Sequence, residues 1–192
     1  MLIGITGGIG SGKSTVLRVI AEQGYPVYDC DAQAKRIIAE DPSVRRQLTA
    51  LFGAEAYKGG TYQTQYVASQ VFAAPDLLAR LNAIVHPAVA RDICAWAEGQ
   101  RLAFVESAIL FSSGISRLCD AVVCIAAPEA VRVERVIRRA AECGQTITSE
   151  QVLARIRTQQ HDEQHADLTI VNDGKTPVTD LAKQIIQFTQ TV

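Results

Sequence analysis

The sequence predicts a three-layer α/β fold built on a central sheet of five parallel strands. Five short strand candidates occur along the chain, at residues 2–5, 25–31, 102–105, 121–126 and 168–171. Stretches with the helical spacing of apolar residues separate them, and this alternation is typical of a parallel sheet with helices on both faces. The chain has 192 residues, of which 48% are hydrophobic, so it can bury the core of a single domain spanning residues 1–192.

The first strand candidate leads into a glycine-rich segment, Gly7–Thr15, which fits the pattern GxxxxGK[ST]. Glycines let the backbone take positive φ and bring successive N–H groups close to a phosphate chain. The residues that follow have the apolar spacing of a helix that ends near Gly24. An ordinary glycine-rich turn is the alternative, but the strand before the segment and the helix after it favour a phosphate-binding P-loop.

Three side chains at the end of this P-loop have distinct expected roles. Lys13 is expected to reach the β- and γ-phosphates of a nucleotide, and Ser14 to help hold Mg²⁺. Thr15 adds a hydroxyl near the phosphates. The anion would then lie at a helix N-terminus, where free N–H groups favour negative charge.

Two carboxylates, Asp29 and Asp31, close the second strand candidate. Ligands of open α/β sheets bind beyond the carboxyl ends of the strands, so these acids are expected at the same sheet edge as the P-loop. The alternative is that one of them only caps the helix that begins near residue 32. We expect one acid to cap this helix and Asp31 to have a catalytic role.

Residues 32–96 have an almost wholly helical pattern, interrupted by a polar loop at 53–64. A helical block of this size is larger than a minimal crossover, so we interpret it as an insertion that covers an acceptor substrate. It contains His86 before Pro87, which the residues alone indicate to be a helix-end histidine with a structural hydrogen bond.

Three arginines, Arg132, Arg135 and Arg139, share one stripe of a long helix that follows the fourth strand candidate. Two interpretations stay open, a solvated helix face or a group of cations around a phosphoryl group in transfer. Residues 143–145 break this helix, and a capping box at 148–151 begins another. The two helices are predicted to form a lid.

Charge and composition disfavour several classes of partner. The formal charge of −1 and the pI near 6.3 leave no basic surplus to hold a nucleic acid. No apolar run approaches the ~18 residues of a membrane span, and the N-terminus enters the first strand without a basic region, so we expect a soluble, cytoplasmic protein. Five cysteines without CxxC spacing are interpreted as buried free thiols. His161 and His165 lack an evident third metal ligand and are interpreted as solvated.

With these motifs placed, the chain resembles the dephospho-CoA kinase family nearly end to end. Members phosphorylate the ribose 3′-hydroxyl of dephospho-CoA with ATP, in the last step of coenzyme A synthesis. The P-loop alone is shared by many kinases and ATPases, so the order and spacing of the other motifs make the resemblance specific. It rests on TGGIGSGKST at 6–15, on Asp29 and Asp31, on the segments 81–87, 109–111, 155–159 and 166–174, and on Arg135 and Arg139.

The resemblance implies a role for each matching residue. The ATP phosphates would be bound by Gly10, Ser11, Gly12, Lys13, Ser14 and Thr15, and the adenine would lie near Asn172 and Gly174. The acceptor side would include Asp31, Lys35 and His86, and Mg²⁺ would be held by Ser14 and Asp31. The catalytic groups would be Lys13, Asp31 as the base, and the lid cations Arg135 and Arg139.

Two positions depart from the family pattern. Lys35 stands where the family often has arginine, which keeps the charge but loses bidentate geometry. Ser112 stands where the family often has glutamate, so a metal or acceptor contact at that position is not expected from this chain.

The sequence and the resemblance together predict a P-loop kinase fold like that of nucleoside monophosphate kinases, with an acceptor-binding insertion at about 32–98 and a lid at about 138–162. Dephospho-CoA is the expected substrate of a monomer or small homo-oligomer with no nucleic-acid or membrane partner. A kinase with another acceptor, such as a nucleoside monophosphate, is the alternative. A nucleotide switch is disfavoured because the chain has no NKxD segment and offers Asp31 as a base.

Overall fold

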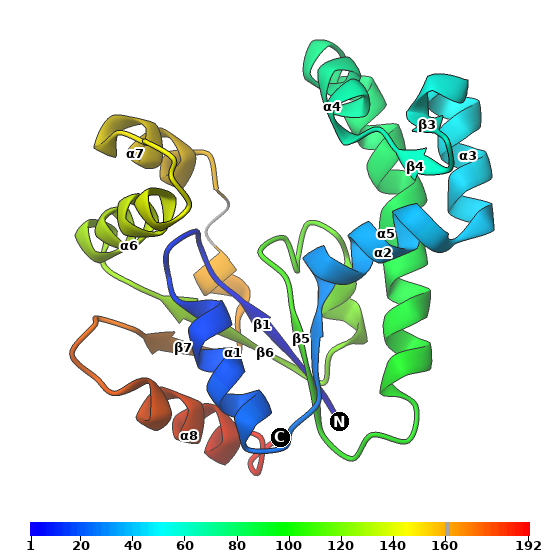
Figure 1. Cartoon of the computed structure of the whole chain (residues 1–192). Helices are drawn as coiled ribbons and strands as arrows, with labels where there is room; N and C mark the ends of the chain where they lie inside the picture. The colour runs from blue at the N-terminus through cyan, green and yellow to red at the C-terminus, as the bar shows by residue number, and fades with distance from the viewer. Residues whose placement is uncertain (160–161) are drawn as a thin grey trace.

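The computed structural model describes residues 1–159 and 162–192, and its centre is a sheet of five parallel strands in the order β2-β5-β1-β6-β7 (Figure 1). The strands are β1 Leu2–Thr6, β2 Val27–Asp29, β5 Ala103–Glu106, β6 Ala121–Ala126 and β7 Leu168–Val171. All five lie within or next to the predicted runs, so the parallel sheet is confirmed. Alternate residues of β1 face opposite sides, since Ile3 and Ile5 join one core cluster and Leu2 joins the other.

Helices cover both faces of this sheet, which confirms the three layers. On one face α1, Lys13–Glu22, packs beside α8, Val178–Phe188, and both bury their apolar stripes against β1 and β6. On the other face the long helix α5, Pro75–Ala97, covers the sheet through Val89 and Ile93. In the described part of the chain, no helix is both long and apolar enough to cross a membrane.

The segment between β2 and β5 forms the predicted helical insertion. Its helices are α2 Cys30–Glu40, α3 Pro42–Phe52, α4 Thr64–Ala73 and α5. The prediction of a plain polar loop at 53–64 is wrong, because a 3₁₀ turn, Ala54–Ala56, and a hairpin of β3 Tyr57–Lys58 and β4 Thr61–Tyr62 form there. Gly59 and Gly60 both have positive φ, which a two-residue hairpin turn requires, and the Tyr57 and Tyr62 rings pack at 5.3 Å across it.

The prediction that His86 ends a helix is also wrong. α5 continues through His86 and Pro87 for another ten residues to Ala97. A proline inside a helix removes one hydrogen bond to the carbonyl four residues earlier, here that of Ala83. Ala83 and Pro87 are both on the exposed side of α5, so water can hydrate this carbonyl and the helix tolerates the proline.

A helical hairpin lies on the P-loop side of the sheet, where the lid was predicted (Figure 1). Its helices are α6, Glu129–Glu142, and α7, Ser149–Arg157, and Gly144 with φ of 70° ends the first of them. The predicted capping box is confirmed, because Thr148 and Gln151 exchange side-chain and backbone hydrogen bonds of 3.0 and 3.2 Å. Val136, Val152 and Ile156 form the small core of the hairpin.

The described cysteines and histidines hold no metal site. No group of three or more metal-ligating side chains occurs among the residues that the structure describes. His161 lies outside them, while His165, in the 3₁₀ turn Asp162–His165, packs its ring 5.6 Å from that of Phe111. All five cysteines are free, but Cys94 and Cys143 are exposed, so the expectation of buried thiols is wrong for these two.

A polar network joins β2 and α2 to α5 at the base of the insertion. The buried hydroxyl of Tyr28 donates to Asp92 Oδ2 at 2.6 Å, and Arg36 Nη2 donates to both Asp92 oxygens at 2.8 and 2.7 Å. Burial opposes ionisation of Asp92, but the hydrogen bonds from Tyr28 and Arg36 outweigh it and lower the pKa of this carboxyl. The network therefore fixes the helix that carries Asp31 relative to the helix that carries His86.

We expect Asp92→Ala to lower the free energy of unfolding by about 1–2 kcal/mol at pH 7, because the buried Tyr28 hydroxyl loses its acceptor and Arg36 loses its partner. Urea unfolding of Asp92→Ala, Tyr28→Phe and the double variant should give a coupling energy above about 0.5 kcal/mol. Additive losses in this cycle would show that the two side chains do not act as a unit.

Candidate active site

The P-loop between β1 and α1 is packed so closely that several of its positions require glycine, Gly10 and Gly12 among them. Gly10 and Gly12 have φ of 77° and 94°. A Cβ at Gly10 would lie 2.6 Å from the carbonyl oxygen of Arg132 on α6, and one at Gly12 would collide with the amide nitrogen of Asn172 after β7. The motif glycines are thus needed both for their backbone conformation and for the approach of two distant segments.

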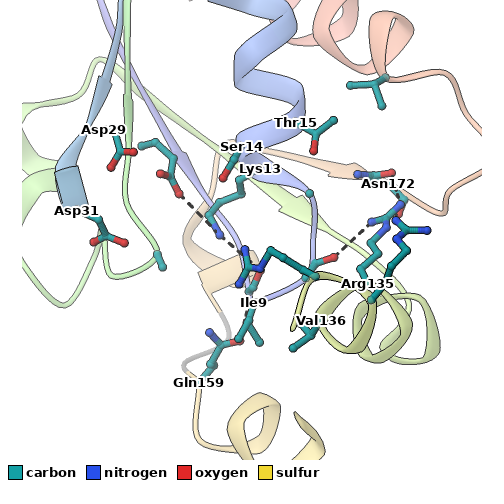
Figure 2. A pocket seen from close by; sticks show the side chains of 18 of the residues that line it. Ile9, Lys13, Ser14, Thr15, Asp29, Asp31, Arg135, Val136, Gln159 and Asn172 are labelled. Carbon is teal, nitrogen blue, oxygen red and sulfur yellow. Dashed lines mark hydrogen bonds and ion pairs between the residues drawn. The ribbon is translucent and has the colours of Figure 1, made fainter. Parts of the chain in front are cut away.

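A cavity of about 690 Å³ opens at the carboxyl ends of β1, β2 and β5, beside the P-loop and α6 (Figure 2). It brings together most of the predicted site residues, namely Gly10, Gly12, Lys13, Ser14, Thr15, Asp31, Arg135, Arg139 and Asn172. Ser11 is buried and does not line it. In the view of Figure 2, Asp31 and Asn172 lie on opposite sides of Lys13, so the cavity has two ends with different chemistry.

Lys13 is held across the mouth of the P-loop. Its Nζ donates to the Gly7 carbonyl at 2.6 Å and lies 3.8 Å from Oε1 of Glu106. Burial lowers the pKa of this ammonium, and the carboxylates of Glu106 and Asp31 partly offset the effect. A cation held in this way in a poorly solvated place interacts strongly with the oxygens of a bound phosphate chain.

Both acids at the junction of β2 and α2 line the cavity, and one of them caps α2, as the sequence predicted. Asp29 is the N-cap of α2 and accepts the backbone N–H of Ala32 at 2.9 Å. Asp31, in the first turn of the same helix, is exposed on the cavity wall. The cap orients the start of α2, and this orientation presents the Asp31 carboxylate to the cavity.

Glu106 is a site residue to which sequence reasoning gave no role. It ends β5 in register with Ile5 of β1 and Asp29 of β2, so it lies between the P-loop strand and the acidic pair. Burial raises the pKa of its carboxyl, and Lys13 counteracts part of this rise. The signal that could have found it is its position, because an acid that ends an apolar strand beside a P-loop faces the phosphate site.

The arginine stripe of α6 divides into two kinds of side chain, which neither sequence interpretation anticipated. Arg135 Nη1 donates to the carbonyls of Gly10, Ser11 and Asn172 at 3.2 to 3.4 Å, and Nη2 donates to Asn172 Oδ1 at 2.9 Å. The Asn172 amide in turn donates to the Ser11 carbonyl at 2.8 Å. Arg135 thus braces the P-loop, whereas Arg139 is exposed and lines the cavity.

Two of the three predicted acceptor residues, Lys35 and His86, lie outside this cavity. Lys35 is exposed on α2 and His86 is half-buried on α5, and neither lines the cavity. Burial lowers the pKa of His86, which keeps the imidazole neutral at pH 7. Gly174 does not line the cavity either, but a Cβ at this position would lie 3.5 Å from Arg135 Nη2. Ser112 donates its hydroxyl to the Ile109 carbonyl within its own turn.

Comparison with known proteins identifies the family. Residues 1–177 match the family model described as dephospho-CoA kinase. The chain belongs to the dephospho-CoA kinase family. A dephospho-CoA kinase of Porphyromonas gingivalis is 41% identical over 192 residues, which cover 99% of this chain and 93% of that protein. The family assignment from the sequence motifs is therefore confirmed, and the chain is an ATP-dependent kinase.

Solved structures agree with the fold. The crystal structure of a Thermus thermophilus protein, 35% identical, superposes with a TM-score of 0.81 over 97% of this kinase and 96% of that chain. A dephospho-CoA kinase from Campylobacter jejuni, 21% identical, has a TM-score of 0.69 over 97% and 95% of the two chains. This second likeness bears on the fold alone. The P-loop kinase fold predicted from the sequence is thus confirmed.

The division of the arginine stripe gives a testable contrast in stability. Arg135→Met should lower the free energy of unfolding by about 2 kcal/mol, because the buried Asn172 side chain and the P-loop carbonyls lose a charged donor. Arg139→Met should change it by less than about 0.5 kcal/mol, because the side chain is exposed. Urea unfolding of the nucleotide-free variants measures both. Equal stabilities of the two variants would contradict the conclusion that Arg135 holds the P-loop in place.

Proposed function

We propose that this kinase transfers the γ-phosphoryl group of ATP to the ribose 3′-hydroxyl of dephospho-CoA, which yields coenzyme A. The observation that carries the proposal is that Lys13 of the P-loop and the carboxylate of Asp31 share one cavity. A cation for the phosphates and a base for a hydroxyl are the two groups that phosphoryl transfer to an alcohol needs. Family membership supplies the identity of the acceptor.

The nucleotide would occupy the end of the cavity formed by the P-loop and Asn172. The backbone of Gly10 to Gly12, Lys13 and the hydroxyls of Ser14 and Thr15 would hold the phosphates at the N-terminus of α1. The adenine would lie near Asn172 and Gly174, where Arg135 fixes the backbone. In this assignment Arg135 acts through the P-loop and Asn172, and it contributes to catalysis by positioning.

The part of the cavity that lies between the side chains of Lys13 and Asp31 suits a magnesium ion. Phosphate oxygens of the nucleotide would complete the coordination of this ion. Mg²⁺ prefers oxygen ligands and is usually bound by one or two carboxylates together with waters and phosphates. The hydroxyl of Ser14 and the carboxylates of Asp31 and Glu106 line this part of the cavity and provide such oxygens. When bound, the ion would neutralise charge on the β- and γ-phosphates.

At the acidic end of the cavity, Asp31 would accept the proton of the attacking hydroxyl. Asp29 is less suited to this task because its carboxylate already accepts a hydrogen bond from Ala32. Arg139 would face the transferring group from α6, where an exposed guanidinium can interact with charge that develops during transfer. Lys13 would stabilise the same charge from the P-loop side.

The acceptor would lie between this cavity and the insertion at about 32–98, with Lys35 and His86 on the insertion side. Because neither side chain lines the phosphate cavity, they would contact parts of dephospho-CoA remote from the reacting hydroxyl. The hairpin of α6 and α7, which overlaps the lid at about 138–162, would cover the phosphates. Mg²⁺, the residue roles and a monomeric or small homo-oligomeric state all belong to this proposal.

The acceptor is tested by incubating the purified protein with ATP and Mg²⁺ and, in parallel, with dephospho-CoA, AMP or CMP. We expect coenzyme A to form with dephospho-CoA and the monophosphates to give less than about 1% of that rate, because the kinase discriminates acceptors by kcat/KM. Phosphorylation of a nucleoside monophosphate at a higher rate than that of dephospho-CoA would show that the proposed acceptor is wrong.

The base is tested by Asp31→Asn, which keeps the size of the side chain and removes its proton-accepting charge. We expect kcat to fall by about two to four orders of magnitude, with near-normal thermal stability and substrate binding. Asp29→Asn is the matched control, since an asparagine also caps a helix, and it should lose less. An inactive Asp29→Asn together with an active Asp31→Asn would show that Asp29 is the base and Asp31 is not.

Arg139→Ala tests the proposed lid cation. If Arg139 acts on charge that develops in the transition state, its removal should lower kcat more than it weakens dephospho-CoA binding. Steady-state kinetics and calorimetric titration with dephospho-CoA separate the two effects. Wild-type kinetics for this variant would mean that Arg139 is only a solvated surface side chain.

A further inference from the structure

The tip of the P-loop is held by two side chains, Arg132 from α6 and Gln159 from just beyond α7. Arg132 Nε on α6 donates to the Ile9 carbonyl at 2.9 Å. The Ile9 N–H donates to Oε1 of Gln159 at 2.9 Å, and Arg132 Nη2 donates to the same oxygen at 2.7 Å. Both polar groups of Ile9 are thus engaged by two side chains that also contact each other.

We propose that Gln159 is a positioning residue for nucleotide binding, which together with Arg132 clamps the Ile9 backbone and holds the P-loop in its phosphate-binding conformation. The pair Arg132 and Gln159 is called the Ile9 clamp below. This proposal rests on the nucleotide-binding half of the proposed function. It gives a role to Gln159, which has none in the P-loop motif or in the proposed chemistry.

The fit of the clamp against the loop is close. A Cβ at Gly8 would collide with the Arg132 guanidinium and would lie 2.9 Å from Gln159 Oε1. The Ile9 side chain also packs against the small core of the α6–α7 hairpin, which Val136, Val152 and Ile156 form. The loop tip is therefore held by its backbone through the clamp and by its side chain through the hairpin core.

The clamp reduces the cost of ordering the loop when a nucleotide binds. A loop of several glycines has large conformational freedom, and fixing it at the moment of binding would reduce affinity. Gln159 is half-buried and lies two residues beyond the end of α7, so α7 determines where its amide oxygen is placed. The N–H of Ile9 donates to this oxygen and the C=O of Ile9 accepts from Arg132, so the clamp orients the two peptide units on either side of Ile9.

The first test is calorimetric titration of the full-length protein with ADP and Mg²⁺, in the absence of any acceptor. Gln159→Met keeps the length and shape of the side chain without the acceptor oxygen, and its Kd for ADP should rise by on the order of tenfold. Gln159→Asn, which keeps the amide but is one methylene shorter, should behave in the same way. Gln145→Met is the matched control in the hairpin, where the glutamine is exposed, and its Kd should equal that of the wild type.

The second test is hydrogen exchange of the nucleotide-free protein, followed in a peptide that spans residues 7–11. Exchange should be faster in Gln159→Met and Gln159→Asn, and protection should return in Gln159→Glu, whose carboxylate can accept from both Ile9 and Arg132. At saturating ATP the kcat of Gln159→Met should fall by less than about threefold, because the clamp acts on nucleotide binding and not on the reacting groups.

Unchanged ADP affinity in both Gln159→Met and Gln159→Asn, or unchanged exchange of the 7–11 peptide, would overturn the clamp. If Gln159→Met fails to fold, Gln159→Asn carries the test. Absence of ADP binding by the wild type would contradict the proposed function instead, and the exchange experiment would still decide the clamp because it uses no nucleotide.

Discussion

The close packing of the P-loop backbone against α6 and the end of β7 is the constraint on which the rest of the site depends. The carbonyl of Ser11 accepts hydrogen bonds from both Arg135 and Asn172, so one loop oxygen joins three segments of the chain. The Arg132 backbone leaves no space for a Cβ at Gly10, and the Asn172 side chain leaves none at Gly12. The glycines of the motif, the place of α6 and the turn after β7 are thus parts of one arrangement.

This arrangement creates a cavity whose two ends differ in charge. At one end the backbone of the P-loop and the N-terminus of α1 present N–H groups, which suit phosphate oxygens. At the other end Asp31 and Glu106 present carboxylates, which suit a metal ion and a hydroxyl proton. Lys13 lies between them, held by the Gly7 carbonyl and near Glu106. In phosphoryl transfer the attacking and leaving oxygens lie roughly in line, and a cation between a phosphate site and a carboxylate suits this reaction.

Local signals in the sequence predicted most of the elements, because strands, caps and the P-loop are determined by neighbouring residues. Thr148 and Gln151 predicted the start of α7, and the P-loop pattern predicted α1. His86 was misplaced because a proline usually limits a helix, and only the exposure of Ala83 in the fold shows why this one does not. The roles of Glu106, Arg135 and Gln159 stayed unpredicted, since each acts through a contact with a P-loop residue about 90 to 150 positions away.

The most direct test of the account is phosphoryl transfer by Lys13→Met, measured as ADP release with dephospho-CoA beside urea unfolding of the same protein. Removing the cation should lower kcat/KM by at least about a hundredfold, the usual loss for one group that stabilises transition-state charge. The free energy of unfolding should stay within about 1 kcal/mol of the wild type, because the burial cost of the Lys13 ammonium offsets its hydrogen bond and its attraction to Glu106. A folded Lys13→Met variant with turnover within tenfold of the wild type would contradict the assignment of this cavity as the phosphoryl-transfer site.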